Sequence, residues 1–465
     1  MGANSVGDIE AVREALVALG LDCRADASTL ATYGHDESDQ GDFPPSLVVF
    51  AKSTAHVQTV LRTCLRHRVP VTPVGARTGK SGGSLPVQGG VSLSLEKMNQ
   101  IISLNPEDLT VVVQPGVLLG DLMRAVEAKG LFYPPDPNSW ETCTLGGNIA
   151  ENAGGPRAVK YGVTKDYVLG LEWVLPTGEV FKVGKRTTKG VVGYDLVGLF
   201  VGSEGTLGIA TEITLKLIPK PLHVMTALVV FASVAAAAKA VSHVMTRGIS
   251  PRALELLDDV SIAAVDGKGF NFPPGCGACV IAEVDGFTSD GVLAELTRVS
   301  EVCTEFGAID TLLAQDESQR EKLWAVRRLV SPSLRAVKRF KFSEDIVVPR
   351  SRMAEAIERF KAVGRTHGLT VATYGHAGDG NLHTNVLYAG PHERQVVERV
   401  LAEIMRITVE LGGTLSGEHG IGIAKARYLG LEQSEALIAL QERLKVFFDP
   451  EVILNPGKIF PKTSK

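Results

Sequence analysis

The hydrophobic positions near the start of the chain follow first helical and then strand spacing. Apolar residues recur every three or four positions within residues 8–20, which predicts an amphipathic helix. An acidic, proline-containing loop at residues 35–45 precedes an apolar strand at 47–50. A helix at 53–68 then connects this strand with another at 69–74. The pattern therefore predicts a β-α-β unit early in the chain.

The other periodic segments fall into two groups on either side of Pro219-Lys220-Pro221. The first group contains a helix at 118–129, a hairpin of strands 167–176 and 180–183, and strands at 109–114 and 211–218. The second contains strands at 225–231, 253–257 and 279–284 and helices at 232–247, 289–306 and from about 318. This order is typical of an antiparallel sheet with helices on one side. We expect domains at residues 1–220 and 221–430, followed by a C-terminal segment at 431–465 that contains a helix at 434–448.

Two histidines lie seven positions apart in a stretch of turn-forming residues between Tyr374 and Asn385. Two imidazoles that share one Zn²⁺, at about 2.0–2.1 Å each, need nitrogens only a few ångströms apart. Seven residues of straight strand would instead separate His376 from His383 by about 23 Å. The chain must therefore fold back, and Gly378-Asp379-Gly380-Asn381 favours a turn there.

A carboxylate and a third imidazole stand side by side at Glu418 and His419, with a glycine on either flank. Two histidines and one carboxylate leave an open coordination position, which is typical of a catalytic divalent-metal site. The alternative is that these are ordinary turn and core histidines. Three of the ten histidines lie within two glycine-bracketed segments, and this clustering favours the metal site.

Residues 73–86 form a glycine-rich loop directly after a predicted strand. The loop is not a Walker A motif, because that motif has four residues between its first glycine and its Gly-Lys-Ser, and only three separate Gly75 from Gly79 here. The helix that must follow the motif would also be broken by Pro86. The G-x-G-x-x-G of a Rossmann fingerprint is absent here too. Backbone N–H groups and the side chains of Arg77, Thr78 and Ser81 would suit a pyrophosphate. The alternative is an ordinary connector.

The motif at residues 375–383, followed by the motif at 416–422, resembles the C-terminal signature of the FAD-linked D-2-hydroxy acid dehydrogenases. This family of vanillyl-alcohol-oxidase-type flavoproteins includes D-lactate dehydrogenase, the glycolate oxidase flavin subunit and D-2-hydroxyglutarate dehydrogenase. The glycine-rich segments at 73–86, 143–155 and 202–209 occur in the order in which the family surrounds its FAD. The resemblance extends over nearly the whole chain beyond about residue 40.

The resemblance implies an α+β fold with a two-part FAD-binding domain of the vanillyl-alcohol-oxidase/PCMH type, not a Rossmann fold. An α+β substrate or cap domain with an antiparallel sheet would follow, and the C-terminal segment would return to the FAD domain. No histidine or cysteine matches a covalent flavin link, so we expect non-covalent FAD. Arg77 stands where relatives often have glycine. The implied FAD-binding residues are Arg77, Thr78, Gly79, Ser81, Gly82, Pro137, Thr144, Gly147, Asn148, Gly154, Glu204, Gly208, Ile209 and Asn455.

The resemblance also implies a substrate site. Arg327 matches the arginine of the family's W-x-x-R motif, and its planar guanidinium suits a substrate carboxylate. Ser331, Lys341 and Asn385 are the other implied substrate-binding residues. The lysine of one relative corresponds to Ser343 here, two positions after Lys341, and the choice of substrate is open for that reason.

His376, His383 and Glu418 are the implied metal ligands, for Zn²⁺ first, with Mn²⁺, Fe²⁺ and Co²⁺ as alternatives. The metal would hold the substrate hydroxyl as a Lewis acid. His419 would remove the hydroxyl proton as general base, and the α-hydrogen would leave as hydride to flavin N5. The alternative assignment makes His419 the ligand and Glu418 the base.

The expected activity is oxidation of a D-2-hydroxy acid, D-lactate or a related acid, to the 2-oxo acid. A quinone, a cytochrome or an electron-transfer flavoprotein would accept the electrons. Within the family, a D-2-hydroxyglutarate dehydrogenase and a glycolate oxidase flavin subunit are the alternatives. Two further possibilities are a non-catalytic flavin electron-transfer subunit and an aryl-alcohol oxidase. The intact metal triad argues against the electron-transfer subunit, and the carboxylate-binding Arg327 argues against the aryl-alcohol oxidase.

Composition excludes several classes of function. A net charge of −4 without a Lys/Arg-rich block leaves no footprint for nucleic acid. Residues 1–17 lack the apolar core of a secretion signal, and no run of 18 apolar residues predicts a membrane span. Six scattered cysteines favour a reducing, cytoplasmic location. A peripheral position at the inner membrane is the alternative location. A homodimer is also left open. Cys276 and Cys279 form one C-x-x-C, interpreted as an incidental loop rather than a redox pair or half a zinc site.

Overall fold

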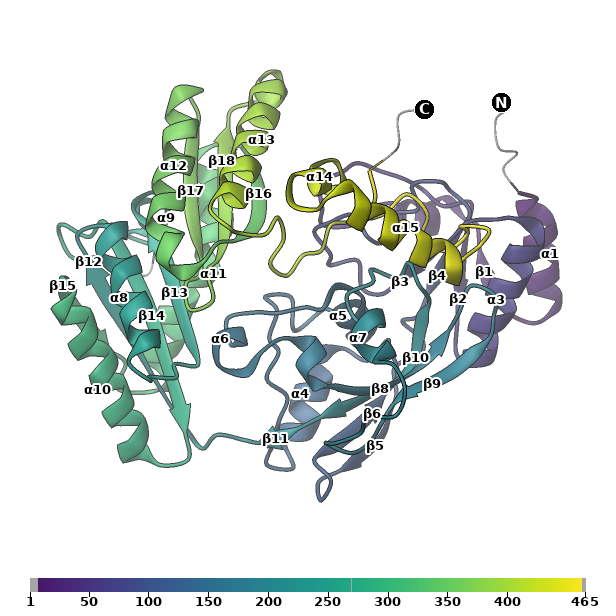
Figure 1. Cartoon of the computed structure of the whole chain (residues 1–465), viewed down its shortest axis with the longest axis horizontal. Helices are drawn as coiled ribbons and strands as arrows, with labels where there is room; N and C mark the ends of the chain where they lie inside the picture. Colours follow the sequence, from purple (N-terminus) through teal and green to yellow (C-terminus); the bar gives the residue numbers. More distant parts are fainter. Residues whose placement is uncertain (1–6, 269, 462–465) are drawn as a thin grey trace. The chain divides into compact units, whose positions relative to one another are not determined.

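The computed structural model describes residues 7–268 and 270–461 (Figure 1). Contacts divide the chain into two units. The first comprises Met1–Gly154, Val163–Lys220 and Glu418–Lys465, and the second comprises Gly155–Gly162 and Pro221–Gly417. The chain returns to the first unit at Glu418, earlier than the boundary after residue 430 that the sequence suggested. Of the N-terminal stretch without a secretion signal, the first six residues lie outside the described part of the chain.

A four-stranded sheet opens the first unit. In sheet order its strands are β1 (Asp22–Arg24), β2 (Leu47–Phe50), β4 (Val91–Ser94) and β3 (Val71–Val74), with β2, β4 and β3 parallel. The predicted β-α-β unit is confirmed, because α3 (Thr54–His67) connects β2 with β3, although the unpredicted β4 lies between them. The helix α1 (Ile9–Ala18) packs on α3, and both share an apolar core with these strands.

The second sheet of this unit is antiparallel. In sheet order its strands are β5 (Ile101–Asn105), β6 (Thr110–Val113), β10 (Ile209–Lys216), β8 (Val168–Val174) and β9 (Val180–Gly184). The hairpin predicted around Thr177 and Gly178 is confirmed as β8–β9. The other elements of the unit are β7 (Leu131–Phe132), β11 (Ile218–Pro219), α2 (Ala27–Thr32), α4 (Leu119–Glu127), α5 (Leu145–Glu151), η1 (Thr164–Tyr167), α7 (Leu196–Phe200), η4 (Ala426–Tyr428), α14 (Leu429–Glu432) and α15 (Glu435–Phe448).

Residues near the C-terminus complete the first sheet. The Val71 N–H donates to the Ile453 carbonyl at 2.8 Å, and the Asn455 N–H donates to the Val71 carbonyl at 2.7 Å. Leu454 thereby forms a parallel bridge with Val71 beside β3. The ends of the described chain therefore belong to one structural unit.

The second unit contains a sheet of seven strands, which is antiparallel as the sequence predicted. In sheet order its strands are β15 (Ala308–Leu313), β12 (His223–Phe231), β14 (Ala278–Gly286), β13 (Ala253–Asp258), β17 (Thr370–His376), β18 (Asn381–Tyr388) and β16 (Phe340–Val347). Its helices are α6 (Ala158–Tyr161), α8 (Val234–Thr246), α9 (Asp259–Val265), α10 (Ser289–Glu305), α11 (Glu317–Val337), η2 (Arg350–Arg352), α12 (Met353–Thr366), η3 (Pro391–Glu393) and α13 (Arg394–Glu410).

Helices cover both faces of this sheet, which corrects the expectation of helices on one side. The helices α8, α10, α12 and α13 lie in front of the sheet in Figure 1. The helices α9 and α11 contact each other and share a separate apolar cluster with the strands, to which Leu257, Ile281 and Tyr374 contribute. This second layer carries Arg327 and Ser331, two of the residues that the resemblance implies in substrate binding.

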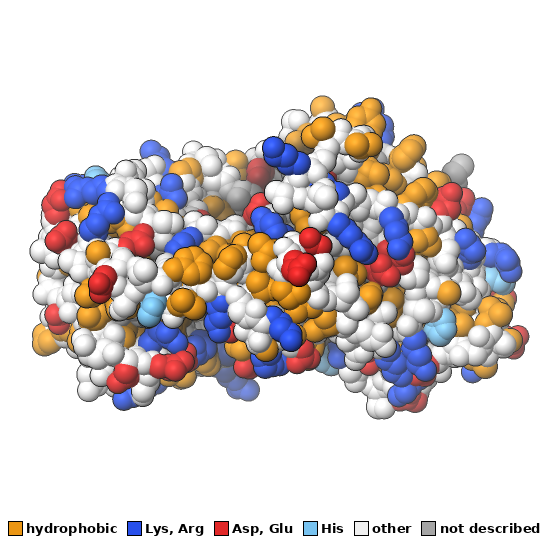
Figure 2. Space-filling model, turned by 90° about the horizontal axis from the view of Figure 1, so that it is seen from below, with side chains coloured by type: hydrophobic (Ala, Val, Ile, Leu, Met, Phe, Trp, Pro, Cys, Tyr) orange, Lys and Arg blue, Asp and Glu red, His pale blue; other side chains and the backbone are white. Residues whose placement is uncertain are grey.

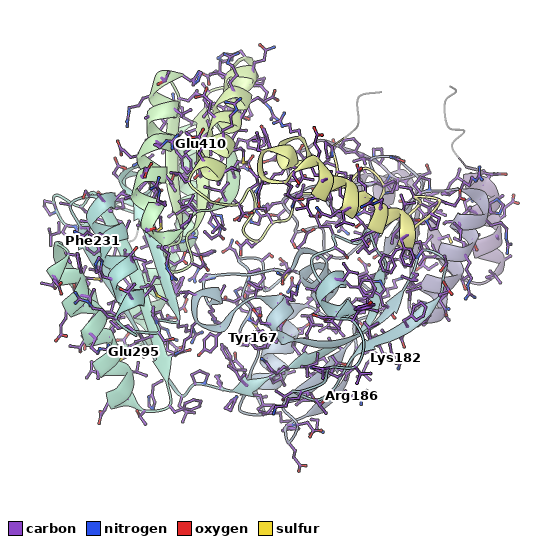
Figure 3. All side chains as sticks on the ribbon, in the orientation of Figure 1. Tyr167, Lys182, Arg186, Phe231, Glu295 and Glu410 are labelled. Atoms are coloured by element: carbon purple, nitrogen blue, oxygen red, sulfur yellow. The ribbon has the colours of Figure 1, made fainter. Side chains whose placement is uncertain are left out.

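The surface is mixed in character. Phe231 at the end of β12 is fully buried and Tyr167 is nearly so, whereas Lys182, Arg186 and Glu410 are exposed (Figure 3). On the face shown in Figure 2, basic side chains are interspersed with acidic and hydrophobic ones. This mixture agrees with the small net charge of the chain.

Candidate active site

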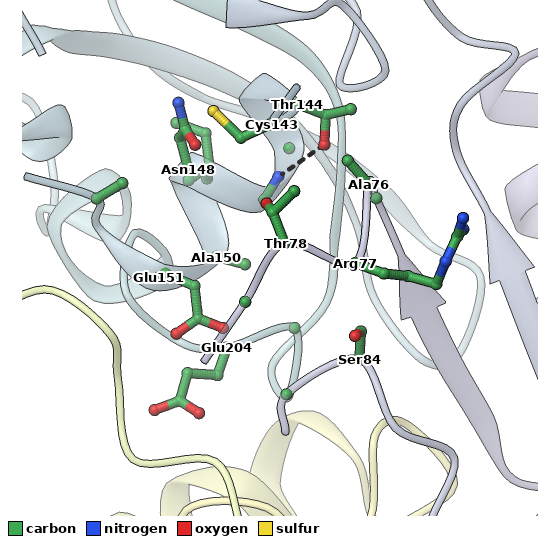
Figure 4. Close-up of a pocket in the computed structure, with 18 of the residues that line it drawn as sticks. Ala76, Arg77, Thr78, Ser84, Cys143, Thr144, Asn148, Ala150, Glu151 and Glu204 are labelled. Carbon is green, nitrogen blue, oxygen red and sulfur yellow. Dashed lines mark hydrogen bonds between the residues drawn. The ribbon is translucent and has the colours of Figure 1, made fainter. Parts of the chain in front are cut away.

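The first unit contains a pocket whose walls come mainly from the three glycine-rich segments (Figure 4). Residues 73–84, 137–154 and 204–210 supply most of the lining, and Glu418 and His419 also contribute. The implied FAD-binding residues that line the pocket are Arg77, Thr78, Gly79, Pro137, Thr144, Gly147, Asn148, Gly154, Glu204, Gly208 and Ile209. Segments far apart in the sequence therefore meet around one pocket.

The pocket walls fit a cofactor that packs closely against backbone. A Cβ added at Gly79 would meet no other atom within 4 Å, so the space beside this glycine is open. The Asn148 Nδ2 donor is buried in the wall without a hydrogen-bond partner in the described chain. An unmade buried hydrogen bond costs about 1–3 kcal/mol, which favours an acceptor on a bound ligand. The Thr144 Oγ1 atom accepts from the Gly147 N–H at 3.4 Å, the dashed line in Figure 4, and caps α5.

Arg77 lines the pocket and has a left-handed backbone. Its φ of 62° lies in the left-handed region, where glycine is favoured, and this explains why glycine also suits the position. Its guanidinium carbon lies 4.4 Å from the centre of the Tyr33 ring. Figure 4 shows the side chain pointing away from Glu151 and Glu204. The guanidinium is therefore held against Tyr33, and the backbone shapes the loop.

Ser81, Gly82 and Asn455 are not part of the pocket lining but hold its loops. The Asn455 Nδ2 donates to the Gly83 carbonyl at 3.0 Å and to the Glu204 carbonyl at 2.8 Å, which joins two glycine-rich segments. The Ser81 carbonyl accepts from the N–H groups of two residues in the C-terminal segment. Gly82 has a φ of 79°, and a Cβ there would lie 2.6 Å from Ile423.

Glu204 holds the segment that follows His419. Its two carboxylate oxygens accept from the N–H groups of Ile421 and Gly422 at 2.7 Å each. Burial raises the pKa of Glu204, and these two hydrogen bonds oppose that rise. Burial and the neighbouring Glu204 also raise the pKa of Glu151, which lines the same pocket. Glu204 thus has a structural task besides its place in the pocket wall.

The hairpin of β17 and β18 brings the two seven-apart histidines together, so the predicted reversal is confirmed. Its register pairs His376 with Asn381 and Tyr374 with His383, and alternation puts both histidines on one face. Gly380 in the turn has a φ of 86°, and a Cβ there would lie 2.1 Å from the Val348 carbonyl oxygen. The Nε2 atoms of His376 and His383 are 3.4 Å apart. We call this side of the sheet the histidine face.

Two buried carboxylates lie on the Nδ1 sides of the two histidine rings. Glu255 Oε1 accepts from His376 Nδ1 at 2.5 Å. Asp345 Oδ1 lies 3.9 Å from His383 Nδ1, and Asp345 Oδ2 accepts from the Gly417 N–H at 2.9 Å. Burial acts to raise the pKa of Glu255, but His376 and Arg327 outweigh it and hold the pKa at about 2. Carboxylates in this position orient metal-binding histidines in many proteins.

The histidine pair fits a divalent metal ion. Two nitrogens bound tetrahedrally at about 2.0–2.1 Å from zinc lie about 3.3–3.4 Å apart, close to the observed Nε2 separation. Glu418 is peptide-bonded to Gly417, whose amide Asp345 fixes. The pair supplies two nitrogen ligands, and Glu418 is the oxygen ligand that the sequence predicted. Nitrogen and oxygen donors in this number suit Zn²⁺ and related ions.

The residues implied in substrate binding meet on the histidine face. Arg327 on α11 donates from Nε to Glu255 Oε2 at 2.6 Å, and its guanidinium carbon lies 4.5 Å from the centre of the Tyr374 ring. The Lys341 Nζ on β16 donates to Ser331 Oγ at 2.6 Å and lies 3.4 Å from Asn385 Oδ1. Lys341, Ser331 and Asn385 therefore form one polar cluster. Arg327 instead contacts Glu255, the carboxylate that also hydrogen-bonds to His376.

Sequence reasoning missed Glu255 and Asp345. A signal for Glu255 exists, because it is a lone glutamate among leucines in the apolar strand β13, where a charge is costly unless paired. His419 lines the pocket shown in Figure 4, and its Nε2 lies 3.9 Å from Glu418 Oε1. Cys279 lies in β14 and Cys276 precedes it, both with free thiols, and burial raises the pKa of Cys276 to about 11. These thiols are unsuited to redox chemistry near neutral pH.

The fold, the pocket and the matching family models together define an FAD-dependent oxidoreductase. The family model described as FAD binding domain matches residues 45–184, and that described as FAD linked oxidases, C-terminal domain, matches residues 220–459. The chain therefore belongs to the FAD-linked oxidases. Solved structures with a similar fold include p-cresol methylhydroxylase with substrate bound (TM-score 0.80, 19% identity, 97% of this chain and 96% of that one). Another is 4-ethylphenol oxidase from Gulosibacter chungangensis (TM-score 0.78, 21% identity, 99% of both chains).

Several relatives align over nearly their full length. The glycolate oxidase subunit GlcD of Bacillus subtilis is 41% identical over 93% of both chains. A D-lactate dehydrogenase of Anaerostipes hadrus is 39% identical over 92% of both chains. A D-2-hydroxyglutarate dehydrogenase of Stutzerimonas stutzeri is 34% identical over 94% of this chain and 95% of its own. Among the helices that the structure describes, none has the length and apolarity needed to cross a bilayer.

Proposed function

We propose that this protein oxidises a D-2-hydroxy acid, D-lactate or a related acid, to the 2-oxo acid, with non-covalent FAD and a divalent metal ion. The observation that carries the proposal is the 3.4 Å separation of the His376 and His383 Nε2 atoms, with Arg327 hydrogen-bonded to the same carboxylate as His376. Relatives named as D-lactate dehydrogenase, glycolate oxidase subunit and D-2-hydroxyglutarate dehydrogenase support the substrate class.

Arg327 is proposed to bind the substrate carboxylate, because a planar guanidinium offers paired N–H donors to a carboxylate. Its Nε is occupied by Glu255, so the two terminal amino groups are the ones proposed to meet the substrate. Lys341, Ser331 and Asn385 are proposed to contact the remainder of the acid. Their mutual hydrogen bonds favour a substrate with polar groups, and D-2-hydroxyglutarate is for this reason the second candidate.

His419 is proposed as the general base that takes the substrate hydroxyl proton, with Glu418 as the third metal ligand beside His376 and His383. The alternative exchanges the roles of Glu418 and His419. The lower exposure of Glu418 favours it as ligand, since its side chain is 11% exposed and that of His419 is 28% exposed. Bound metal would supply Lewis-acid polarisation of the hydroxyl. Bound FAD would supply the hydride acceptor.

The partners and the location follow from this proposal. Reoxidation of the flavin needs an electron acceptor, and a quinone, a cytochrome or an electron-transfer flavoprotein would serve. We propose a cytoplasmic protein, with a peripheral position at the inner membrane and a homodimer as alternatives. A glycolate oxidase flavin subunit and a non-catalytic electron-transfer subunit are further candidate functions.

Dye reduction by the purified yellow protein tests the proposal. D-lactate, glycolate and D-2-hydroxyglutarate would each be compared before and after chelation, with re-addition of Zn²⁺ or Mn²⁺. One of the three acids should be oxidised at least tenfold faster than the others, and chelation should abolish its turnover. Full activity after complete removal of metal would refute the metal site and leave the histidines as structural residues.

Stereochemistry gives an independent test. One base, one metal and one anchoring arginine fix the face of C2 that meets the flavin, so D-lactate and not L-lactate should reduce the dye. Equal turnover of both enantiomers would refute the geometry of the proposed site. Flavin content per chain, measured after acid precipitation, shows whether inactivity towards both enantiomers reflects simple loss of cofactor.

A further inference from the structure

Glu255 connects two parts of the proposed active site through a single carboxylate. It lies in the middle of β13 and is fully buried. One oxygen accepts from His376 Nδ1 at 2.5 Å, and the other accepts from Arg327 Nε at 2.6 Å. The proposed metal ligand and the proposed substrate anchor therefore share one hydrogen-bond acceptor group.

The shared carboxylate fixes the tautomer of His376 and the orientation of the Arg327 guanidinium. With its Nδ1 proton donated to Glu255, His376 presents the lone pair of Nε2 towards His383, which is the tautomer that binds metal. With its Nε–H donated to the same group, Arg327 has its terminal amino groups oriented away from Glu255. A shift of either partner moves the carboxylate on which the other depends.

A second buried glutamate on the neighbouring strand provides an internal comparison. Glu283 on β14 forms an ion pair with Arg252 at 3.2 Å and accepts from Trp324 Nε1 at 2.7 Å and Thr226 Oγ1 at 2.8 Å. It matches Glu255 in residue type, in burial and in having an arginine partner. Its contacts in the described structure do not include the two histidines, so it serves as a matched control.

We infer that Glu255 is a positioning residue that couples metal binding at His376 to substrate binding at Arg327. The inference rests on the proposed function of these residues. A carboxylate satisfies both donors at once, whereas the amide of Gln offers only one accepting oxygen and presents N–H donors to the other partner. Coupling of this kind is reciprocal, so loss of the arginine should also change the affinity for metal.

Zinc affinity of the flavin-loaded, metal-stripped protein tests the inference, measured by competition with a chromophoric chelator. Glu255→Gln should weaken Zn²⁺ binding about 10–100-fold, the usual effect of losing such a carboxylate. Glu283→Gln should bind zinc within twofold of wild type. Arg327→Met should also weaken zinc binding. In the double variant Arg327→Met/Glu255→Gln, the loss of zinc-binding free energy should be smaller than the sum of the losses in the two single variants. Flavin content and melting temperature confirm that each variant is folded.

Unchanged zinc affinity in a folded Glu255→Gln protein would overturn the inference. Equal weakening by Glu283→Gln would overturn it as well, because the effect would then reflect general loss of packing. If Glu255→Gln fails to fold, Arg327→Met decides alone, and unaltered zinc affinity in that variant refutes the coupling. A wild-type protein that binds no Zn²⁺ would instead remove the proposed metal site itself, and the inference with it.

Discussion

The flavin pocket and the histidine face are constructed in opposite ways. The pocket is formed mainly by backbone, from loops in which glycines leave open space or adopt left-handed conformations. The histidine face is formed by side chains that project from β13, β16, β17, β18 and α11. The pocket would hold its cofactor by close approach of the chain, whereas the proposed metal and substrate site would bind through charged and imidazole groups at fixed separations.

This difference determines which substitutions each site tolerates. In the pocket an added side chain acts by filling space meant for the ligand, so the effect is on cofactor affinity. On the histidine face a removed side chain leaves a buried partner unsatisfied, so the effect spreads through the hydrogen-bonded network. Substitutions can therefore separate the two kinds of site, and those at the metal ligands should have the largest effect.

His376→Ala should remove a metal ligand and reduce turnover by about three orders of magnitude or more, since Lewis-acid stabilisation is worth several kcal/mol. Flavin absorbance should stay near one per chain, because His376 does not belong to the flavin pocket. The matched control is His367→Ala, which removes an imidazole bonded to Glu403 in the same unit. Turnover assays and metal analysis check both variants, and a fully active His376→Ala protein would contradict the metal site.

Arg327→Lys should raise the KM for the hydroxy acid more than it lowers kcat. Lysine keeps the charge but not the planar pair of donors, and loss of a charged hydrogen bond costs about 1.5–3 kcal/mol, or about 10–150-fold in kcat/KM. Arg328→Lys is the control, because the adjacent Arg328 is exposed and pairs with Glu321. Steady-state kinetics that changed equally in both variants would exclude a specific role for Arg327.

Gly79→Val should weaken FAD binding about tenfold or more while the apoprotein keeps its melting temperature. The side chain would enter open space beside the pocket lining, and overpacking against a ligand costs about 1–3 kcal/mol. Gly430→Val places the same side chain in open space away from the pocket. Flavin titration of the two apoproteins compares them, and equal FAD affinity would show that Gly79 does not adjoin the cofactor.

Cys276→Ser should have the smallest effect, below about 0.5 kcal/mol in stability and without change in turnover. The thiol lies outside both sites, and its raised pKa disfavours the reactive thiolate. Thermal melts and dye reduction under oxidising and reducing conditions provide the measurement. A redox-dependent difference between wild type and Cys276→Ser would favour a redox pair instead.

The two sites also differ in how far the sequence predicted them. Loops such as residues 73–86 are recognisable from the sequence, because glycine at high density indicates backbone that must turn sharply or approach a ligand closely. The reversal between His376 and His383 was predictable for a similar reason, from its turn residues. Glu255 was not predictable as a partner of His376, because that contact depends on strand order in the sheet and on the register between β13 and β17.

The helices α9, α12 and α13 and the strand β4 were also missed. The helix predicted from about residue 318 was found, but its place on a second face of the sheet was not expected, since such positions are fixed by packing between distant segments. Arg77 shows the same limit. Its type suggested a phosphate donor, but neither its left-handed backbone nor its contact with the Tyr33 ring was predictable from the sequence. Residue chemistry alone could not reveal the direction in which the side chain points.

The pairing of Val71 with Ile453 and Asn455 has a consequence for biosynthesis. Asn455 links the glycine-rich segments, and the residues around it complete the sheet that begins near residue 22. During translation, residues 22–200 leave the ribosome long before residues 450–455 are made. The flavin pocket therefore lacks part of its support until residues 450–455 have been made. A nascent chain that stalls or is cleaved before residue 450 should be unable to retain the cofactor, however complete its glycine-rich loops are.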